Sequence, residues 1–224
     1  MKHVWRPKQQ LGNSLCVVGF LLLSGCINLD KSSSTTVQMM PASARFADTV
    51  EGAIITVPQW GGTPLEPIAI AQARKHVITH ITLHHQGETF VRGRDPQQYL
   101  RNLQTWSRRT RKWLDIPYHY IIDLDGKIYA GRDIQYAGDT NTEYDPTGHA
   151  LIEVVGNFEE VEPNPAQLNA VVNVMTMLSV KHRVKPDKIA GHKDVSGQTV
   201  CPGKYLYRYL ANGYFQNEVR KNLP

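Results

Sequence analysis

The segment GHKDVSGQTVCPG, residues 191–203, contains a histidine and a cysteine nine positions apart, His192 and Cys201. Its content of Gly, Ser and Pro predicts a loop rather than a helix. Imidazole and thiolate groups are common zinc ligands, and a third ligand from an upstream strand would leave one position of a tetrahedral ion open. This arrangement is typical of a hydrolytic metal site, in which zinc lowers the pKa of a water molecule and polarises a carbonyl.

A candidate third ligand lies at the end of a predicted strand. VITHITL (Val77–Leu83) is rich in β-branched residues and runs directly into His84 and His85. Adjacent side chains of a strand point to opposite faces, so at most one of the two histidines is expected at a given site. Alone, the pair could be surface histidines at a strand end. A structural zinc site would need a fourth protein ligand, for which the sequence offers no convincing candidate.

The first 25 residues have the pattern of an export signal. Three basic residues precede the apolar run Leu15–Leu23, which is too short to span a bilayer, and small residues then lead to Cys26. The ending LSGC resembles the lipobox of bacterial lipoproteins, whose cysteine is lipidated; the alternative is an ordinary signal peptide with a chance cysteine. Ile27 follows, not the aspartate associated with inner-membrane retention. We therefore expect an exported outer-membrane lipoprotein that faces the periplasm, attached to the membrane by its N-terminal lipid.

Removal of this signal changes how charge and cysteine content are interpreted. The chain has 25 Lys and Arg against 20 Asp and Glu, and three of the basic residues lie in residues 1–25, which leaves 22 against 20. A balance so close to neutral gives no reason to expect a nucleic-acid partner. With Cys16 in the signal and Cys26 lipidated, Cys201 is the only thiol of the folded part, so no internal disulfide can form.

The rest of the chain predicts one α/β domain over residues 53–212. A polar, aperiodic stretch over residues 26–52 is expected to be a flexible tether, and residues 213–224 a short C-terminal tail. Ordered structure is expected from about Ile54. The predicted elements are the strand at 77–83, a helix opening at Asp95-Pro96, a hairpin over Tyr118–Gly131, a buried strand at Leu151–Asn157 and a helix from Asn164-Pro165 to before Pro186. This order indicates a central mixed β-sheet flanked by helices.

Several segments, in the same order, resemble the zinc-dependent N-acetylmuramoyl-L-alanine amidases. The fold of these enzymes is shared by peptidoglycan recognition proteins and by a phage lysozyme that is an amidase. The matching segments are PQWGGTP, ITLHHQ, WLDIPYHYIIDLDGKIYAGRD, ALIEVVGNFE, NPAQLNAV and IAGHKDVSGQTVCPGKYLY. They extend from Trp60 to about Leu210. The resemblance implies the amidase fold, a Zn²⁺ cofactor and a peptidoglycan or muropeptide substrate.

The resemblance also implies a role for individual positions. It places the zinc ligands at His84, His192 and Cys201, with His84 chosen over its neighbour by the strand-then-histidine pattern. The catalytic tyrosine of the family falls on Tyr118, whose hydroxyl would act as an oxyanion donor; a tyrosine on a hairpin is more often a core aromatic. Cys201 favours the branch that resembles recognition proteins, because other periplasmic lipoprotein amidases have aspartate at this position.

Glu153 and Thr199 complete the candidate site. A carboxylate inside a buried strand is costly unless it is paired or functional, and the family often has a glutamate here that helps activate water. We therefore expect Glu153 to be a general base; the alternative is a glutamate paired with a neighbouring Arg or Tyr. Thr199 occupies the position of a catalytic lysine in the phage enzyme, and an auxiliary role is expected for its hydroxyl.

The sequence thus predicts an enzyme that cleaves the amide between N-acetylmuramic acid and L-alanine. The alternative is a non-catalytic peptidoglycan-binding module, and such relatives have typically lost the cysteine. One departure concerns the loop between His192 and Cys201. It is one residue longer than in related recognition proteins, so we expect it to bulge near Ser196-Gly197.

Overall fold

The computed structural model describes residues 40–223. The expected signal sequence at residues 1–25, the lipidation position Cys26 and the first part of the expected tether lie outside the described residues. No helix of residues 40–223 is both long and apolar enough to cross a bilayer.

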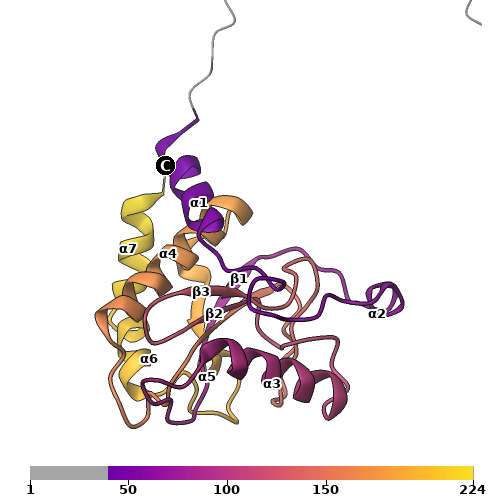
Figure 1. Ribbon diagram of the computed structural model, residues 1–224. Helices are drawn as coiled ribbons and strands as arrows, with labels where there is room; N and C mark the ends of the chain where they lie inside the picture. The colour runs from indigo at the N-terminus through magenta and orange to yellow at the C-terminus, as the bar shows by residue number, and fades with distance from the viewer. Residues whose placement is uncertain (1–39, 224) are drawn as a thin grey trace, which may run out of the picture. The chain divides into compact units, whose positions relative to one another are not determined.

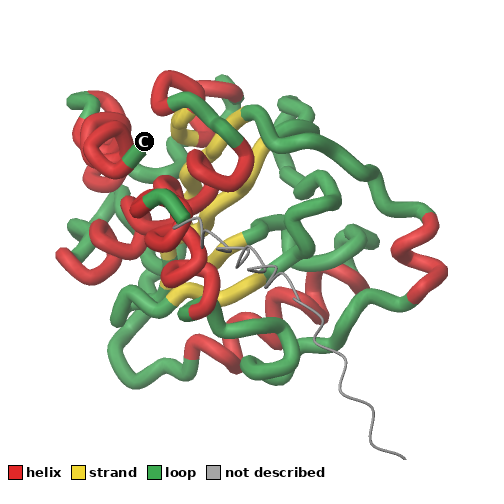
Figure 2. Tube along the Cα trace, turned by 90° about the horizontal axis from the view of Figure 1, so that it is seen from above, coloured by secondary structure: helices red, strands yellow, loops and turns green. Residues whose placement is uncertain are grey.

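A five-stranded mixed sheet forms the centre of the domain (Figures 1 and 2). Its strands are β1 (His80–His85), β2 (Tyr120–Ile122), β3 (Ile128–Ala130), β4 (His149–Val154) and β5 (Ile189–Gly191), in the spatial order β3-β2-β4-β1-β5. Strands β2, β4, β1 and β5 are parallel, and only β3, an edge strand, is antiparallel, as the second strand of the predicted hairpin. This confirms the predicted α/β class with a mixed sheet.

The two faces of the sheet pack against different helices. One face contacts helix α4 (Pro165–His182), supported by α1 (Ala42–Gly52), α6 (Lys204–Ala211) and α7 (Tyr214–Asn222). The opposite face packs against α3 (Pro96–Arg109), whose Leu100 shares a cluster with Ile121. Because strand side chains alternate, Ile81 and Leu83 enter the first core, whereas His84 points to the side of α3.

The starts of the two long helices agree with the predicted caps. The Asp95 side chain accepts a 2.9 Å hydrogen bond from the Gln97 amide at the start of α3. Asn164 and Gln167 form a reciprocal capping box at the start of α4.

Helix α4 ends at His182, before the predicted stop at Pro186. Its end is set by Arg183, which adopts a left-handed conformation with φ of 57°. The short helix α2 (Pro67–Ala71) lies in the connection before β1, and a 3-10 turn, η1 (Pro186–Lys188), precedes β5.

Two boundaries of the predicted domain were wrong. Residues 42–52 of the expected tether form α1, whose Ala47 and Val50 are buried against α4, while Lys181 of α4 pairs with Asp48 and Glu51. Residues 214–222 of the expected tail form α7. Both helices are short and mostly polar. Their few apolar residues become buried only because α4 packs beside them, so the local sequence does not indicate that they belong to the core.

The apolar contacts of α7 show why the tail belongs to the domain. Phe215 and Val219, one helical turn apart, are fully buried in the core beneath α4. Burial of a phenylalanine and a valine stabilises the fold by roughly 1.5–3 kcal/mol each. The ordered domain therefore extends beyond residue 212.

Candidate metal centre and active site

The candidate site forms where the parallel strands end. His84 is the fifth residue of β1, and its partner in the register with β4 is Glu153. Neighbouring residues in a parallel register point to the same face, so the two side chains lie side by side above the sheet. Ligand sites of open α/β sheets are commonly found at the carboxyl ends of the strands, and this site follows that rule.

Strand β5 positions His192. It pairs with β1 through residues 189–191, and His192 follows it directly, at the start of the single helical turn α5 (His192–Val195). Neither β5 nor α5 was predicted, and the expectation that residues 191–203 contain no helix was wrong for this one turn. A hydrogen bond of 2.8 Å from the Lys193 amide to the Cys201 carbonyl closes the loop, so both candidate ligands face the same space.

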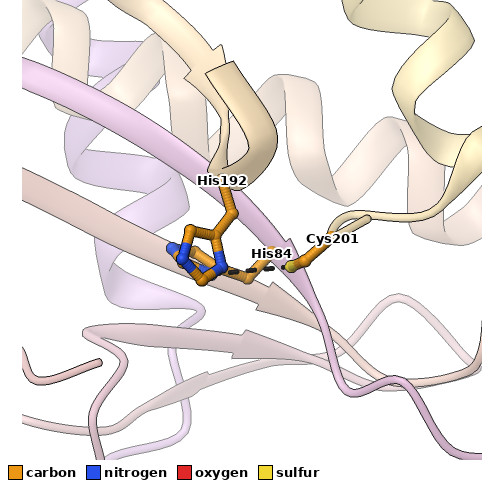
Figure 3. Close-up of side chains that lie close together, drawn as sticks. All are labelled: His84, His192 and Cys201. Atoms are coloured by element: carbon orange, nitrogen blue, oxygen red, sulfur yellow. Dashed lines mark hydrogen bonds between the residues drawn. The ribbon is translucent and has the colours of Figure 1, made fainter. Parts of the chain in front are cut away.

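Three side chains converge at this point (Figure 3). Ligand atoms of His84, His192 and Cys201 all lie within 4.8 Å of one another, and the His84 Nδ1 to Cys201 Sγ distance is 3.7 Å. Tetrahedral zinc with ordinary Zn–N and Zn–S bond lengths separates a nitrogen and a sulfur ligand by about 3.6 Å. The donor types and their separation therefore fit a zinc ion with three protein ligands.

The protonation of these groups also suits a metal site. Burial lowers the pKa of His84 well below its usual value, and lowers the pKa of His192 to about 4. Both imidazoles are therefore neutral at pH 7, the form that binds metal. Burial raises the pKa of the Cys201 thiol to about 12, so metal binding at this residue would displace its proton.

His85 turns away from this cluster, as the alternation along a strand predicts. Its Nδ1 accepts a 3.2 Å hydrogen bond from the Phe158 amide, and its ring stacks near that of Phe158. The His85 amide instead donates to Cys201 Sγ at 3.3 Å. The structure therefore places His84 rather than His85 among the candidate ligands, and gives His85 a part in orienting the thiol.

Glu153 is buried and has one free carboxylate oxygen. The Tyr99 hydroxyl donates to its Oε1 at 2.9 Å, whereas no residue of the described chain hydrogen-bonds to Oε2. Burial raises the pKa of Glu153 to about 8, against the opposing effect of the Tyr99 hydrogen bond. Nothing in the sequence around Tyr99 indicates this contact, which spans 54 positions of the chain.

Tyr118 lies beside His84, and Thr199 lies beside Cys201. The ring of Tyr118 is 5.2 Å from that of His84, and burial raises its pKa well above the usual value, so its hydroxyl stays protonated. The Thr199 hydroxyl accepts a 3.0 Å hydrogen bond from the Cys201 amide. The contact therefore gives Thr199 a place in shaping the ligand loop.

All six predicted site residues line one groove of about 660 Å³. They are His84, Tyr118, Glu153, His192, Thr199 and Cys201. Its other walls include Trp106 of α3, Trp113 beyond the end of α3, and the loop that carries residues 139–142. A concave site of this volume, with convergent polar groups, suits a substrate of several sugar or amino-acid units.

The loop between β3 and β4 supplies partners that the sequence did not reveal. The Thr142 hydroxyl lies 2.8 Å from His192 Nε2, and the Tyr144 hydroxyl lies 3.5 Å from His84 Nε2. A partner on the second ring nitrogen fixes the orientation of a metal-binding histidine. Glu143 of the same loop accepts hydrogen bonds from Ser196 Oγ and the Gly197 amide, and so fastens the segment where a bulge was expected.

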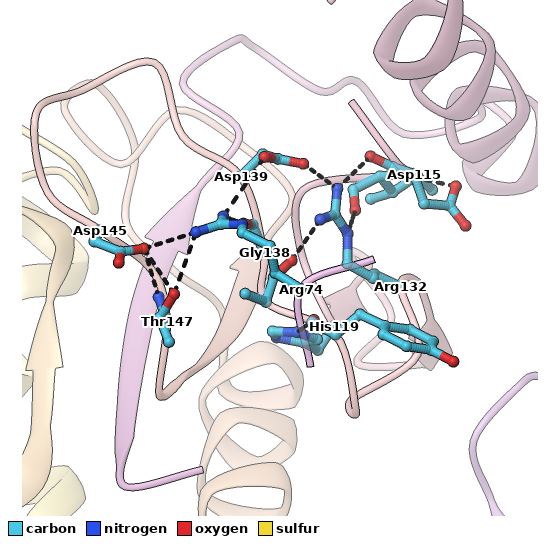
Figure 4. Close-up of polar contacts among 11 residues, drawn as sticks. Arg74, Asp115, His119, Arg132, Gly138, Asp139, Asp145 and Thr147 are labelled. Carbon is cyan, nitrogen blue, oxygen red and sulfur yellow. Dashed lines mark hydrogen bonds and ion pairs between the residues drawn. The ribbon is translucent and has the colours of Figure 1, made fainter. Parts of the chain in front are cut away.

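Two arginines anchor this loop to the rest of the domain (Figure 4). Arg132 is buried and donates to the carbonyls of Asp115, Ile116 and Ala137 as well as to the Asp139 carboxylate. It thereby joins the segment that leads to Tyr118 to the start of the 139–142 wall. Arg74 pairs with Asp145 at the far end of the loop.

Comparison with known proteins identifies the family. The family model described as N-acetylmuramoyl-L-alanine amidase matches residues 74–204, more than half of the chain and all of the residues of the candidate site. The chain belongs to this family.

Two relatives and one solved structure illustrate the similarity. A peptidoglycan-recognition protein SD from Drosophila simulans is 32% identical over 163 residues, covering 70% of this chain and 83% of its own length. An N-acetylmuramoyl-L-alanine amidase from Mus musculus is 32% identical over 113 residues, which cover 50% of this chain but 21% of the mouse protein. The crystal structure of a Drosophila recognition protein SD superposes with a TM-score of 0.61 at 28% identity, over 70% of this chain and 92% of that one.

Proposed function

We propose that this amidase-family chain is a zinc-dependent hydrolase that cleaves the amide between N-acetylmuramic acid and L-alanine of peptidoglycan. The observation that carries the proposal is the convergence of His84, His192 and Cys201 beside a buried carboxylate, at the floor of an open groove. The family match and the mouse amidase support the reaction class.

Zinc would be held by the two imidazoles and the Cys201 thiolate. When bound, it would supply a Lewis acid that polarises the scissile carbonyl and makes a water molecule more acidic. The remaining steps fall to the side chains around it, which bind, orient and move protons.

Glu153 is suited to accept the proton of the attacking water. Its Oε2 is free, and a pKa near 8 lies close to neutral pH, where a general base is also a competent acid. The same carboxyl can then pass the proton to the leaving nitrogen of L-alanine. Tyr118, held as a neutral phenol beside His84, is suited to donate a hydrogen bond to the oxygen that gains negative charge.

Product analysis tests this proposal. Digestion of purified peptidoglycan should release peptides with a free L-alanine amino group and leave the glycan strands uncut, as shown by mass spectrometry. Cys201→Ser should release no such peptides above background. Cleavage within the glycan, or within the stem peptide, would contradict the assigned reaction. Binding without any cleavage would favour the non-catalytic alternative.

We further propose that the chain is exported and attached to the outer membrane through a lipid on Cys26. The support is the residue pattern of the N-terminal 26 positions alone. Metabolic labelling with a radioactive fatty acid should mark the full chain and not Cys26→Ala. Equal labelling of both would refute the anchor while leaving the enzymatic proposal intact.

A further inference from the structure

A second cavity adjoins the groove at its aromatic wall. This cavity, of about 390 Å³, lies between the segment that contains α2 and the C-terminal end of α3, and Trp113 lines both cavities. Trp106, which lines the groove beside it, is 42% exposed, which is unusual for so large an apolar side chain. A surface suited to ligand contact therefore continues past the site of hydrolysis.

Basic residues lie along this surface. Four of the five residues at positions 108–112 are Arg or Lys. The Arg108 side chain is engaged by Asp115 and the Thr63 carbonyl. Arg111 and Lys112 are exposed, and neither has a carboxylate within ion-pair distance among residues 40–223.

Helix capping does not explain these two residues. Basic residues near a helix C-terminus offset the helix dipole, which accounts for Arg108 and Arg109 inside α3. Arg111 and Lys112 follow the end of the helix. Lys112 has φ of 57°, a conformation that is costly for lysine, and its side chain lines the second cavity. The Arg111 guanidinium lies 5.0 Å from the ring centre of Trp113 and 5.9 Å from that of Trp106.

We propose that Trp106, Trp113, Arg111 and Lys112 form a secondary binding surface for polymeric peptidoglycan, through carboxylates of stem peptides next to the one being cleaved. This inference rests on the proposed function and specifies its substrate class as the polymer rather than an isolated muropeptide. Unpaired cations beside aromatic faces match a glycan polymer whose peptides carry free carboxylates. The continuity through Trp113 lets one long substrate contact both regions.

A double variant, Arg111→Gln with Lys112→Asn, tests the surface at two residues that do not themselves line the groove of the reaction. Asparagine is chosen because it tolerates the left-handed backbone at position 112. Turnover of intact sacculi at low salt should fall roughly three- to tenfold, as expected for two exposed ionic contacts. Hydrolysis of a soluble muramoyl dipeptide, which has the scissile amide but no neighbouring peptides, should stay unchanged. High salt should remove the difference, because exposed charges are then screened.

The matched control removes the same charge elsewhere. Lys185→Asn with Lys188→Gln alters two exposed lysines before β5, far from the carboxyl ends of the strands, and should leave both activities unchanged. The inference is overturned if the double variant matches this control on sacculi, or loses activity equally on both substrates. If the wild type hydrolyses neither substrate, the proposed function fails. Co-sedimentation with sacculi at low salt then still tests the surface: weaker binding by the double variant than by the control supports it, and equal binding overturns it.

Discussion

His84 and Glu153 are register partners on adjacent parallel strands, and their side chains lie next to each other on the same face of the sheet. A candidate metal ligand and a candidate general base are therefore fixed by backbone hydrogen bonds rather than by flexible loops. Of the three candidate metal ligands, His192 and Cys201 lie outside the strands, in a segment that is fastened by β5 on one side and by Glu143 on the other.

Glu153→Gln should greatly lower turnover with little effect on folding. Glutamine keeps the shape and can still accept the Tyr99 hydrogen bond, but it cannot take a proton. Loss of a general base typically lowers turnover by roughly 10²- to 10⁴-fold. Zinc content and thermal unfolding should match the wild type, and Glu162→Gln, a surface carboxylate paired with Arg208, should retain full activity. Activity within a few-fold of wild type would rule out Glu153 as the base.

Tyr99→Phe should shift the pH dependence of the reaction. The Tyr99 hydrogen bond lowers the pKa of Glu153, so its removal raises this pKa further. A base acts in its ionised form, and the acidic limb of the kcat/KM profile should therefore move to higher pH, with roughly tenfold less activity at pH 7. Tyr205→Phe, on α6 at the opposite face of the sheet, is the control. A uniform loss at every pH, with the limb unmoved, would assign Tyr99 a purely structural role.

Thr142→Val should weaken zinc binding without altering the three ligands. The substitution keeps the shape of the side chain but removes the hydroxyl beside His192 Nε2. Loss of such an outer partner typically costs 10- to 100-fold in metal affinity. Competition with a chromophoric chelator measures this change, and Thr49→Val, at an exposed threonine of α1, provides the control. An unchanged zinc affinity would show that the Thr142 contact does not orient His192.

His119 should make the free energy of unfolding decrease as the pH falls. It is buried with both ring nitrogens hydrogen-bonded, to the Leu151 amide and the Tyr136 carbonyl, and burial lowers its pKa to about 3. The folded state thus binds fewer protons than the unfolded state between pH 3 and about 6.5. The stabilisation is complete above pH 6.5 and is lost as the pH falls towards 3.

The measurement is urea unfolding of metal-free protein across this pH range. In His119→Gln the slope of unfolding free energy against pH should be smaller by about 1.4 kcal/mol per pH unit, the value for one proton. Other buried histidines contribute equally to both proteins and cancel. Identical slopes for the variant and the wild type would contradict a neutral, buried His119.

Local patterns were sufficient to predict much of the fold. Asp95 and Asn164 marked the starts of α3 and α4, and the hairpin was predicted within residues 118–131, because caps and turns depend on neighbouring residues. Helix α7 and strand β5 were missed, since each is short and gains its stability from distant segments. Phe215 becomes a core residue only against α4, and three residues of β5 carry no detectable alternation.

The candidate site, like the fold, was predicted only in part. Resemblance to a family placed the ligands, and the structure brings all of them to one groove. Tyr99 and Thr142 could not be found from sequence, because each contacts the site across about fifty intervening residues. Such contacts depend on which loops the sheet brings together, and a single sequence does not reveal them.

Zinc content and bond cleavage, measured on the same preparation, test the central claim most directly. The wild type should bind one zinc ion per chain and release free L-alanine amino groups from peptidoglycan. A chelator should abolish this release and added zinc should restore it, while Cys201→Ser should lose both zinc and activity. A wild-type protein that holds its zinc and binds peptidoglycan, yet generates no free L-alanine amino group, would contradict the account.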